Sequence, residues 1–249
     1  MIESQSGQFR SSGEEGAVPE FEEKRPHRTR IFLARHGESE HNIAEVPYFA
    51  GGSLEQDTPL TEKGIESAKK VAERLREAHV EILVSSDLKR SKQTAEVIAQ
   101  ELGYPVEIIE LEGLREVHVG ELTGKTRDQV RTEGSEAAQR ALELFISGDI
   151  RKIDFPGGDS YESVCQRVKE VLNRIVREHG DKAKIAIIGH GNINHIILSL
   201  MFPDQIDFVN QLDLSHERVV ELDMTLDKNR KPDFNNIKVY GEGENRGLI

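Results

Sequence analysis

Cysteine is almost absent from this sequence. Cys165 is the single cysteine among 249 residues, so an intramolecular disulfide and a cysteine-based zinc cluster are both excluded. Because Cys165 lies in an apolar helical stripe beside Val164 and Val168, packing is a better explanation for it than reactivity. The histidines show no metal-binding spacing such as His-Glu-x-x-His. We therefore expect neither a metal nor a cofactor.

Long apolar runs are also absent, and positively charged residues are outnumbered by negatively charged ones. No apolar stretch approaches the roughly 20 residues that a membrane span requires. Aspartate and glutamate number 45 against 33 lysines and arginines, which gives a formal net charge of -12. Such a protein repels nucleic-acid backbones and anionic lipid surfaces at long range, so we expect neither nucleic acid nor membrane as a partner. An anionic small substrate would need a local basic patch.

The two ends of the chain differ from its middle. Residues 1–28 combine low hydrophobicity, turn formers and scattered charge, which predicts a disordered tail. Because this stretch has no apolar signal-peptide core, we expect a cytoplasmic protein. Residues 29–226 are expected to form one globular domain. Residues 227–249 are polar, so any strand near 237–240 would be an edge strand followed by a loose tail.

Short β-branched runs alternate with helix-period segments in the middle of the chain. This order predicts a three-layer α/β/α sandwich, in which helices cover both faces of a mostly parallel central sheet. The runs are short and apolar, as buried strands are. The expected strands cover residues 31–34, 82–85, 106–109, 185–188 and 219–224.

Helical spacing of apolar residues predicts the covering helices. Ile65, Ala68, Ala72 and Leu75 repeat on one face of the first helix. The longest helix is expected to begin after an Asp159 N-cap and to stop at Gly180. Two further helices are expected over 88–102 and 193–201.

Basic residues directly follow three of the expected strands. Arg35 and His36 follow the first strand, Arg90 lies shortly after the second, and His190 follows the strand at 185–188. Since the carboxyl ends of parallel strands meet at one sheet edge, where ligands bind, we expect these side chains to share a pocket. The guanidinium fork suits phosphate oxygens. The sequence therefore predicts a phosphate-binding basin within an acidic protein.

This basin suggests phosphoryl transfer through histidine. Neighbouring arginines disfavour a second positive charge on imidazole, so a neutral His36 can attack phosphorus while Arg35, Arg90 and His190 hold the oxygens. The leaving alkoxide needs a proton. Glu116 lies in a loop after the strand at 106–109, where a dianionic substrate would keep it protonated as the general acid. Glu121 is a nearby competitor for this role.

With these residues in place, the chain resembles the histidine phosphatase superfamily, in the branch that contains cofactor-dependent phosphoglycerate mutases and their phosphatase relatives. The resemblance extends from about residue 30 to 224 and depends on motifs in the family's order. They are Arg35-His36-Gly37-Glu38-Ser39 with Asn42, Thr58-Pro59-Leu60-Thr61-Glu62-Lys63-Gly64, Ser85-Ser86-Asp87-Leu88-Lys89-Arg90-Ser91, Glu116, Pro156-Gly157-Gly158-Asp159-Ser160 and Gly189-His190-Gly191.

The resemblance implies a role for each matching residue. His36 would be the phosphorylated nucleophile, and Glu116 would donate and accept the proton. Phosphoryl and substrate binding would involve Arg35, Asn42, Arg90, His190 and Gly191. Asn42 comes from the resemblance alone, and capping of a local helix is the alternative explanation for it.

Two segments depart from the family pattern. Mutases carry adjacent arginines after the proton-donor loop, whereas residues 126–154 here contain the separated Arg127, Arg131, Arg140 and Arg151. The loop at 43–56 is longer than in the phosphatase relatives and lacks their Gly-Trp turn, which leaves Ser53 as a weak candidate for a second phosphate contact. The motif after His190 continues Asn192-Ile193-Asn194-His195, where relatives have glycine and then arginine.

These features together favour a metal-independent phosphatase that hydrolyses phosphomonoesters of small metabolites through phosphohistidine. The alternatives are a 2,3-bisphosphoglycerate-dependent phosphoglycerate mutase and a non-catalytic phospholigand-binding module. The expected partner is a phosphorylated small molecule, and a homodimer remains open.

Overall fold

The computed structural model describes residues 28–45, 47–179, 184–226, 232–241 and 247–248. Residues 1–27 of the predicted N-terminal tail lie outside this range, and Arg28, its last residue, begins the first strand. A seven-stranded sheet in the order β3-β2-β4-β1-β5-β6-β7 forms its centre. The strands are β1 (Arg28–Arg35), β2 (Ile82–Ser85), β3 (Glu107–Glu110), β4 (Lys184–Gly189), β5 (Val219–Leu226), β6 (Pro232–Tyr240) and β7 (Gly247–Leu248). The pairs among β3, β2, β4 and β1 are parallel, whereas β5, β6 and β7 continue the sheet antiparallel.

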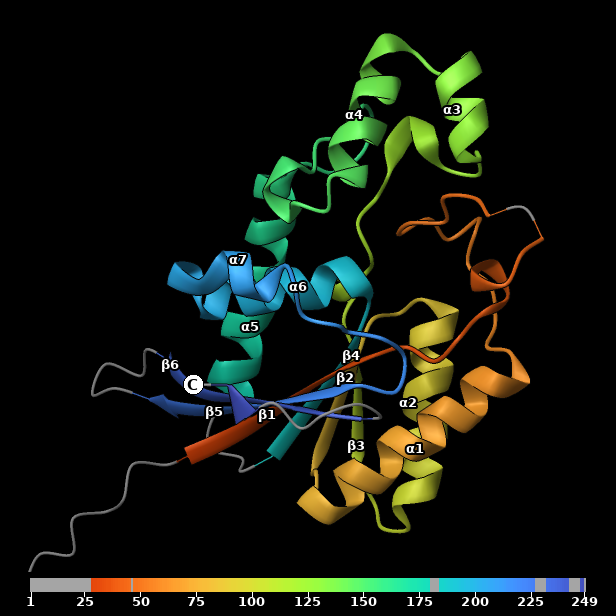
Figure 1. Cartoon of the computed structure of the whole chain (residues 1–249). Helices are drawn as coiled ribbons and strands as arrows, with labels where there is room; N and C mark the ends of the chain where they lie inside the picture. The colour runs from red at the N-terminus through yellow and green to blue at the C-terminus, as the bar shows by residue number, and fades with distance from the viewer. Residues whose placement is uncertain (1–27, 46, 180–183, 227–231, 242–246, 249) are drawn as a thin grey trace, which may run out of the picture.

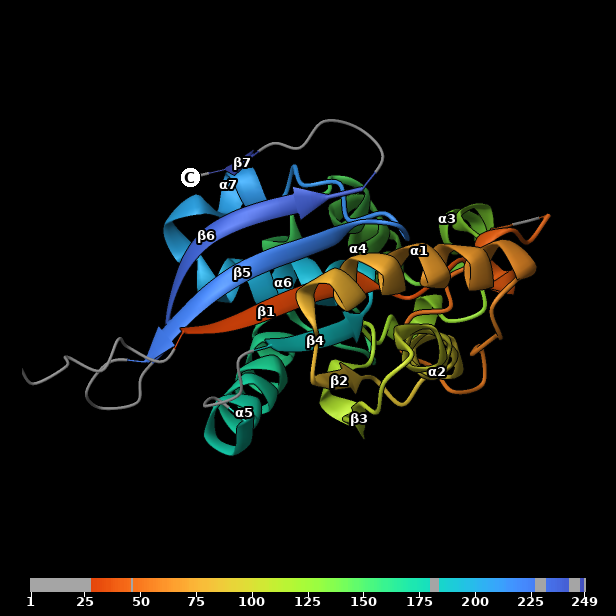
Figure 2. The ribbon, with the colours of Figure 1, turned by 90° about the horizontal axis from the view of Figure 1, so that it is seen from below.

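Helices cover both faces of this sheet, which confirms the predicted three-layer class (Figures 1 and 2). One face carries α1 (Glu62–Ala78) and α2 (Lys89–Leu102), and the other carries α5 (Tyr161–His179), α6 (Gly191–Met201) and α7 (Ile206–Val209). The helices α3 (Arg127–Glu133) and α4 (Glu136–Ile146) project beyond the layers in Figure 1. Short 3-10 turns are η1 (Glu40–Asn42), η2 (Glu112–Leu114), η3 (Gly120–Leu122), η4 (Ile150–Lys152) and η5 (Pro203–Gln205).

The central strands are buried on both faces, which explains their continuous apolar sequences. Successive side chains of a strand point to opposite sides. Phe32 and Ala34 of β1 therefore join the core beneath α1 and α2, while Ile31 and Leu33 join the larger core beneath α5 and α6. Cys165 is buried in the larger core.

Helix starts follow from local hydroxyl groups. Thr61 caps α1, because its side chain accepts a hydrogen bond from the Gly64 N–H at 3.0 Å. Ser160 and Ser163 bond each other's backbone N–H at the start of α5, at 3.0 and 3.2 Å. The predicted Asp159 cap was therefore off by one residue, and the predicted stop at Gly180 lies outside the described residues.

Two expectations about burial were wrong. The strand expected at 106–109 is β3, the edge strand, and Ile108 is 38% exposed because no strand lies beyond it. Ile65 is 37% exposed, since the buried face of α1 uses Gly64 and Val71 in its place. The strand expected near 237–240 is part of β6, which pairs with β5 on one side and β7 on the other.

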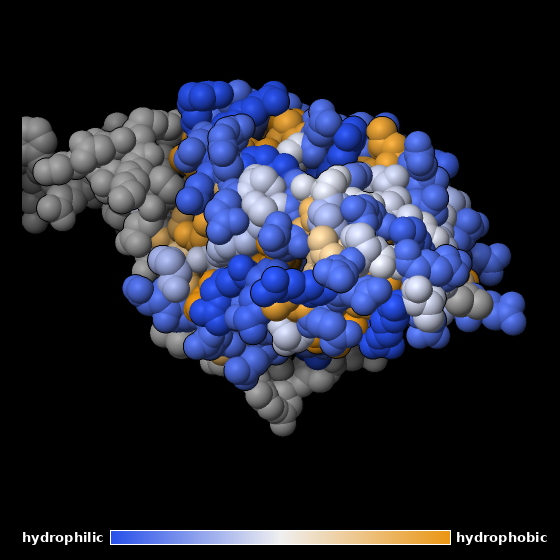
Figure 3. Space-filling view, turned by 90° about the horizontal axis from the view of Figure 1, so that it is seen from above, coloured by the Kyte–Doolittle hydropathy of each residue, from blue (hydrophilic) through white to orange (hydrophobic). Residues whose placement is uncertain are grey.

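The surface agrees with the polar composition. Seen from above, the molecule is mostly hydrophilic, with small scattered apolar groups (Figure 3). No helix within the described ranges is long and apolar enough to cross a bilayer.

Candidate active site

The parallel register brings the three predicted basic segments to one edge of the sheet. Arg35 of β1 is opposite Gly189 of β4, and Ser85 of β2 is opposite Ile188. The residues after these positions therefore come together, and the rings of His36 and His190 lie 5.1 Å apart between centroids. The site is assembled by strand pairing across more than 150 residues of sequence, since His36 and His190 are 154 positions apart.

Hydrogen bonds determine which nitrogen of His36 can react. The backbone N–H of His36 donates to the Gly189 carbonyl at 3.0 Å, which attaches the residue to β4. Its ring Nδ1 lies 2.7 Å from the Gly37 carbonyl. Because a carbonyl only accepts, Nδ1 carries the proton and Nε2 keeps its lone pair. His36 is 2% exposed, so a single nitrogen of a buried, oriented ring is left for chemistry.

Burial is the main reason why His36 is neutral. Desolvation lowers the pKa of His36 well below its usual value, and His190, Arg35 and Arg90 lower it further. The sequence argument had named the arginines, which are real but secondary contributors. The pKa of His190 is lowered in the same way, by burial first and then by Arg90 and Arg35. Both imidazoles are therefore uncharged near neutral pH.

Three buried donors around His36 lack a protein partner. Arg35 Nε, Arg90 Nε and His190 Nδ1 are buried without a hydrogen bond to any described residue. On its other side, His190 Nε2 lies 2.7 Å from the Ser86 hydroxyl, which also accepts from the Leu88 N–H. When the Ser86 hydroxyl donates to Nε2, the His190 proton lies on Nδ1. Buried N–H groups without partners are costly, so this cluster is built to receive an acceptor-rich anion.

Arg90 is the most deeply buried of the cationic side chains described. It is 1% exposed, although two lysines, Lys89 and Lys92, lie close to it in the sequence. Its Nη1 bonds Asp57 Oδ1 at 2.9 Å, and its Nη2 bonds the Gly51 carbonyl at 2.9 Å. Asp57 also accepts from the Lys89 N–H at the start of α2. The carboxylate therefore compensates the buried guanidinium and fixes its orientation.

Glu116 reaches the same pocket from the loop after η2. Its Oε1 accepts from the Val117 N–H at 2.9 Å, and its Oε2 lies 3.3 Å from the Asn192 N–H in α6. Glu116 also lies close enough to Arg35 and Arg90 to raise the pKa of both guanidinium groups, although burial lowers each pKa overall. A carboxyl group at this position can exchange a proton with a group bound between the arginines.

The competing carboxylate Glu121, and Glu38 two residues after His36, are both engaged elsewhere. Glu121 accepts from the Ser135 hydroxyl at 2.7 Å, at the start of α4. Glu38 accepts from Thr61 at 2.9 Å and from Lys63 at 3.1 Å, and these two bonds lower its pKa. Glu38 thus ties the nucleophile loop to α1.

Asn42 caps its own turn. Its Oδ1 accepts from the Ser39 N–H and hydroxyl, each at 3.0 Å, and its Nδ2 lies 3.0 Å from His41 Nε2. His41 Nδ1 in turn lies 2.9 Å from the Ser39 hydroxyl. The three side chains form a closed ring of hydrogen bonds, and one amide hydrogen of Asn42 remains for a ligand.

The 43–56 loop and the 126–154 segment meet beside this pocket. Tyr48 pairs with Thr126, and Phe49 pairs with Thr123. A cavity of about 520 Å³ lies there, lined by Tyr48, Arg127 and neighbouring residues. The Ser53 hydroxyl accepts from the Glu55 N–H within its own turn. Of the four separated arginines, Arg131 pairs with Asp128 and Glu143, and Arg151 pairs with Asp149 and Asp207.

Sequence reasoning missed several residues that orient the site. Asp57 stands directly before the Thr58-Pro59 motif but outside it, and Ser86 stands within the motif at 85–91, which was quoted without a role for Ser86. Arg167 of α5 had no signal, because it lies 51 residues from Glu116. Its guanidinium bonds the carbonyls of Gly113 and Arg115 at 2.8 Å and the Asp159 carboxylate at 3.0 Å. It thereby holds the loop that carries Glu116.

A metal is not needed to explain these contacts. Across the described part of the chain, no group of three or more His, Cys, Asp or Glu residues is arranged to hold a metal ion.

Comparisons with known proteins agree with this geometry. Residues 31–237 match the profile of the histidine phosphatase superfamily, branch 1. A metal-independent phosphoserine phosphatase from Arabidopsis thaliana is 35% identical over 167 residues, which are 66% of this chain and 65% of the plant protein. A 2,3-bisphosphoglycerate-dependent phosphoglycerate mutase from Cytophaga hutchinsonii is 30% identical over 212 residues, 78% of this chain and 95% of the mutase.

Solved structures show the same fold. Bacillus stearothermophilus YhfR superposes with a TM-score of 0.69 at 26% identity, covering 83% of this chain and 94% of YhfR. The chain spans slightly less than two thirds of the length of the plant phosphatase, its first curated relative, so the substrate of that protein is not transferred with the fold.

Proposed function

Because the chain belongs to the histidine phosphatase superfamily, branch 1, we propose that it is a metal-independent phosphatase that hydrolyses phosphomonoesters through phosphohistidine at His36. One observation carries the proposal. Arg35 Nε, Arg90 Nε and His190 Nδ1 are buried without protein partners around the unprotonated Nε2 of His36. Donors around an oriented nucleophile fit a phosphoryl group better than they fit any neutral ligand.

The first step transfers the phosphoryl group to the enzyme. The lone pair of His36 Nε2 attacks phosphorus, forming the N–P bond while the P–O bond to the leaving group breaks. Arg35, Arg90 and the His190 Nδ1–H hold the equatorial oxygens throughout. Glu116 gives its proton to the departing oxygen, which leaves as an alcohol.

The second step returns the enzyme to its starting state. The Glu116 carboxylate takes a proton from a water molecule, whose oxygen attacks phosphorus and breaks the N–P bond. Orthophosphate then departs, and Glu116 is again protonated. The hydrogen bond from His36 Nδ1–H to the Gly37 carbonyl keeps the imidazole in the same tautomer in both steps.

The test is capture of the phosphoenzyme. Wild-type protein mixed with a labelled phosphomonoester in the presence of chelator and quenched with alkaline detergent should carry acid-labile, base-stable label, and His36→Ala should carry none. Turnover should fall by roughly a thousandfold or more in that variant. His179→Ala, at the last residue of α5 and outside every site motif, is the matched control and should keep both label and turnover. Turnover without any phosphoenzyme would exclude the two-step route.

A mutase is the second candidate, because the Cytophaga enzyme matches over nearly its whole length. The 126–154 segment argues against it, since Arg131 and Arg151 are occupied in ion pairs and no two arginines are adjacent. Conversion of 3-phosphoglycerate to 2-phosphoglycerate, stimulated by 2,3-bisphosphoglycerate and faster than hydrolysis, would establish the mutase reading.

The substrate class proposed is a phosphorylated small metabolite. The cavity beside Tyr48 and Arg127 adjoins the site through His41, whose ring centroid lies 6.2 Å from that of His36 and 6.5 Å from that of Tyr48. A leaving group extending from the phosphate can therefore contact this wall. The cytoplasmic location and the homodimer remain predictions.

A further inference from the structure

His216 lies against the nucleophile, although no motif pointed to it and the mechanism above gives it no role. It belongs to the loop that leads into β5. Its ring Nδ1 lies 2.5 Å from the backbone carbonyl oxygen of His36, and the two ring centroids are 5.3 Å apart. Because a carbonyl only accepts, His216 Nδ1 is the donor.

The His36 carbonyl is at a place where the sheet no longer supplies a donor. The last β1–β5 pair is Ala34 with Val219, and the last β1–β4 pair is Arg35 with Gly189. The N–H of His36 still reaches Gly189, but its carbonyl lies past both ladders. His216 supplies the N–H that a further strand residue would otherwise give. A buried carbonyl without such a partner costs free energy and loosens the peptide.

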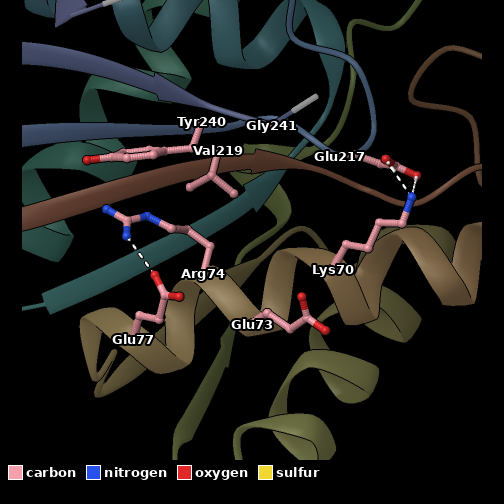
Figure 4. Close-up of a pocket in the computed structure, with 8 residues that line it drawn as sticks. All are labelled: Lys70, Glu73, Arg74, Glu77, Glu217, Val219, Tyr240 and Gly241. Atoms are coloured by element: carbon pink, nitrogen blue, oxygen red, sulfur yellow. Dashed lines mark hydrogen bonds and ion pairs between the residues drawn. The ribbon is translucent and has the colours of Figure 1, made fainter. Parts of the chain in front are cut away.

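The loop that carries His216 is anchored on both sides of it. Glu217 binds Lys70 of α1 through both oxygens at 3.0 Å, as Figure 4 shows, and it also accepts from Ser67 at 3.2 Å. Arg218 pairs with Asp213 at 3.4 Å across the loop. The imidazole donor is therefore presented by a restrained segment.

His216 donates without adding charge beside the nucleophile. Burial lowers its pKa, Arg35 and Lys63 lower it further, and the bond to His36 and the nearby Glu38 act in the opposite direction. A neutral imidazole with its proton on Nδ1 results. A hollow of about 250 Å³ next to the ring, lined by Glu38, Lys63 and Ser67 among others, leaves room for a different side chain.

We propose that His216 is a positioning residue for His36. The His216 N–H fixes the backbone of His36 from the β5 side, and the Gly37 carbonyl fixes the imidazole ring of His36. Together they direct Nε2 toward the N–H groups that we propose bind the phosphoryl group. This inference rests on the proposed phosphohistidine mechanism and adds to it a residue from outside the family motifs. A displacement of about 1 Å at a reacting group can cost roughly a hundredfold in rate.

Three substitutions separate the hydrogen bond from the bulk of the ring. In His216→Asn the amide nitrogen occupies the place of Nδ1, and in His216→Gln it occupies the place of Nε2. The alanine variant removes the hydrogen bond and the bulk of the ring. We expect kcat to fall about ten- to a hundredfold in the alanine and glutamine variants, with KM within about twofold of wild type, and we expect the asparagine variant to recover most of the loss. Glu73→Gln, on the α1 surface in Figure 4, is the control that should change neither constant.

Other outcomes would overturn the inference. Unchanged kcat in all three variants would remove any positioning role, and an equal fall in all three would show that the Nδ1 donor is not what matters. Orthophosphate affinity, measured by calorimetry, should stay close to wild type in each folded variant, because the donors of the phosphate site are unchanged.

A second measurement does not depend on turnover. Imidazole ¹⁵N–¹H spectra should show shifted His36 ring resonances in the glutamine variant and nearly wild-type resonances in the asparagine variant. If wild-type protein forms no phosphoenzyme, the proposed function fails, and these spectra still decide whether His216 orients His36. Identical His36 resonances in wild type and all three variants would refute the orientation.

Discussion

At the scale of single residues, the site depends on which atoms are already satisfied. His36 has its N–H, its carbonyl and its Nδ1 bonded, and its Nε2 is left. Arg90 has both terminal nitrogens bonded to Asp57 and Gly51, and its Nε is left. The protein thus orients each group through hydrogen bonds to its other atoms and leaves one nitrogen of each without a protein partner among the described residues.

Glu116 can be tested through the leaving group. Glu116→Gln removes the proton donor, so hydrolysis of an alkyl phosphate, whose alkoxide is a poor leaving group, should slow by roughly a hundredfold or more. Hydrolysis of nitrophenyl phosphate should slow far less, because its leaving group departs without a proton. Steady-state rates with both substrates give the comparison. Equal slowing of the two would exclude Glu116 as the acid.

Asp57 can be tested through stability and its response to phosphate. Asp57→Asn leaves the buried Arg90 without its counter-charge, which should lower the free energy of unfolding by about 3 kcal/mol. Orthophosphate should then raise the melting temperature more than it does in wild type, because the anion becomes the main partner of the guanidinium. Asp149→Asn, which breaks an exposed pair with Arg151, should have little effect. A variant as stable as wild type without phosphate would contradict this account of Asp57.

At the scale of elements, the nucleophile loop and α1 are packed backbone against backbone. A Cβ at Gly37 would meet the Gly64 carbonyl, and a Cβ at Gly64 would meet the Glu38 carbonyl. Thr61 and Lys63 hold Glu38 across the same contact. The motif at 58–64 therefore supports the nucleophile loop without touching the ligand.

Gly64 should be intolerant of a side chain. Gly64→Ala should lower the free energy of unfolding by about 2–3 kcal/mol, because two backbones must separate to make room. Gly103→Ala is the control: it meets no atom within 4 Å, and its cost of about 1 kcal/mol comes from a positive φ of 76°. Urea denaturation of both variants measures the difference. A smaller loss at Gly64 than at Gly103 would show that the close approach can relax.

At the scale of the whole molecule, an acidic protein encloses a cationic site. The net charge is -12, yet Arg35 and Arg90 face a single pocket with His36 and His190. The imidazoles of His36 and His190 stay neutral beside the two arginines, which limits the electrostatic repulsion between groups in the pocket. The positive charge is thus supplied by the arginines, while the neutral histidines suit the roles of nucleophile and donor that we propose for them.

The neutral histidines make stability depend on pH. The folded-state pKa values of His36, His190 and His216 are lowered, and that of His41 is lowered to about 4, mainly by burial in every case. Below pH ~6.5 the unfolded chain therefore binds protons that the folded chain does not, so the free energy of unfolding should fall as pH falls from ~6.5 to ~4.5. Carboxylates with lowered pKa, such as Glu38, add to this loss below that range.

His36 and His190 are both fully buried. Each can change the free energy of unfolding by up to about 1.4 kcal/mol per pH unit in this range. Urea denaturation at several pH values measures the slope, and His190→Asn should reduce it. Stability that does not change between pH 6.5 and 5 would show that these rings are protonated in the folded state.

Much of the architecture could be predicted from local patterns. Apolar runs identified the parallel strands, and their carboxyl ends pointed to one shared pocket for His36, Arg90 and His190. The edge position of β3 was missed because Val106, Ile108 and Ile109 are apolar, although the charged Glu107 and Glu110 in the same segment are typical of an edge strand. The N-cap of α5 was misplaced by one residue, since Asp159 and Ser160 are both good caps and tertiary bonds to His118 and Arg167 engage Asp159.

By itself the sequence determined the fold class, the family and the residues that we propose as the nucleophile and its basic neighbours, because short-range patterns and ordered motifs carry that information. Tertiary structure decided which ring nitrogen of His36 is free and where His216 lies. It also decided how Asp57 orients Arg90 and how Arg167 holds the loop that carries Glu116. The contacts of Asp57, Arg167 and His216 join positions 33 to 180 residues apart, and only folding brings them within hydrogen-bond distance.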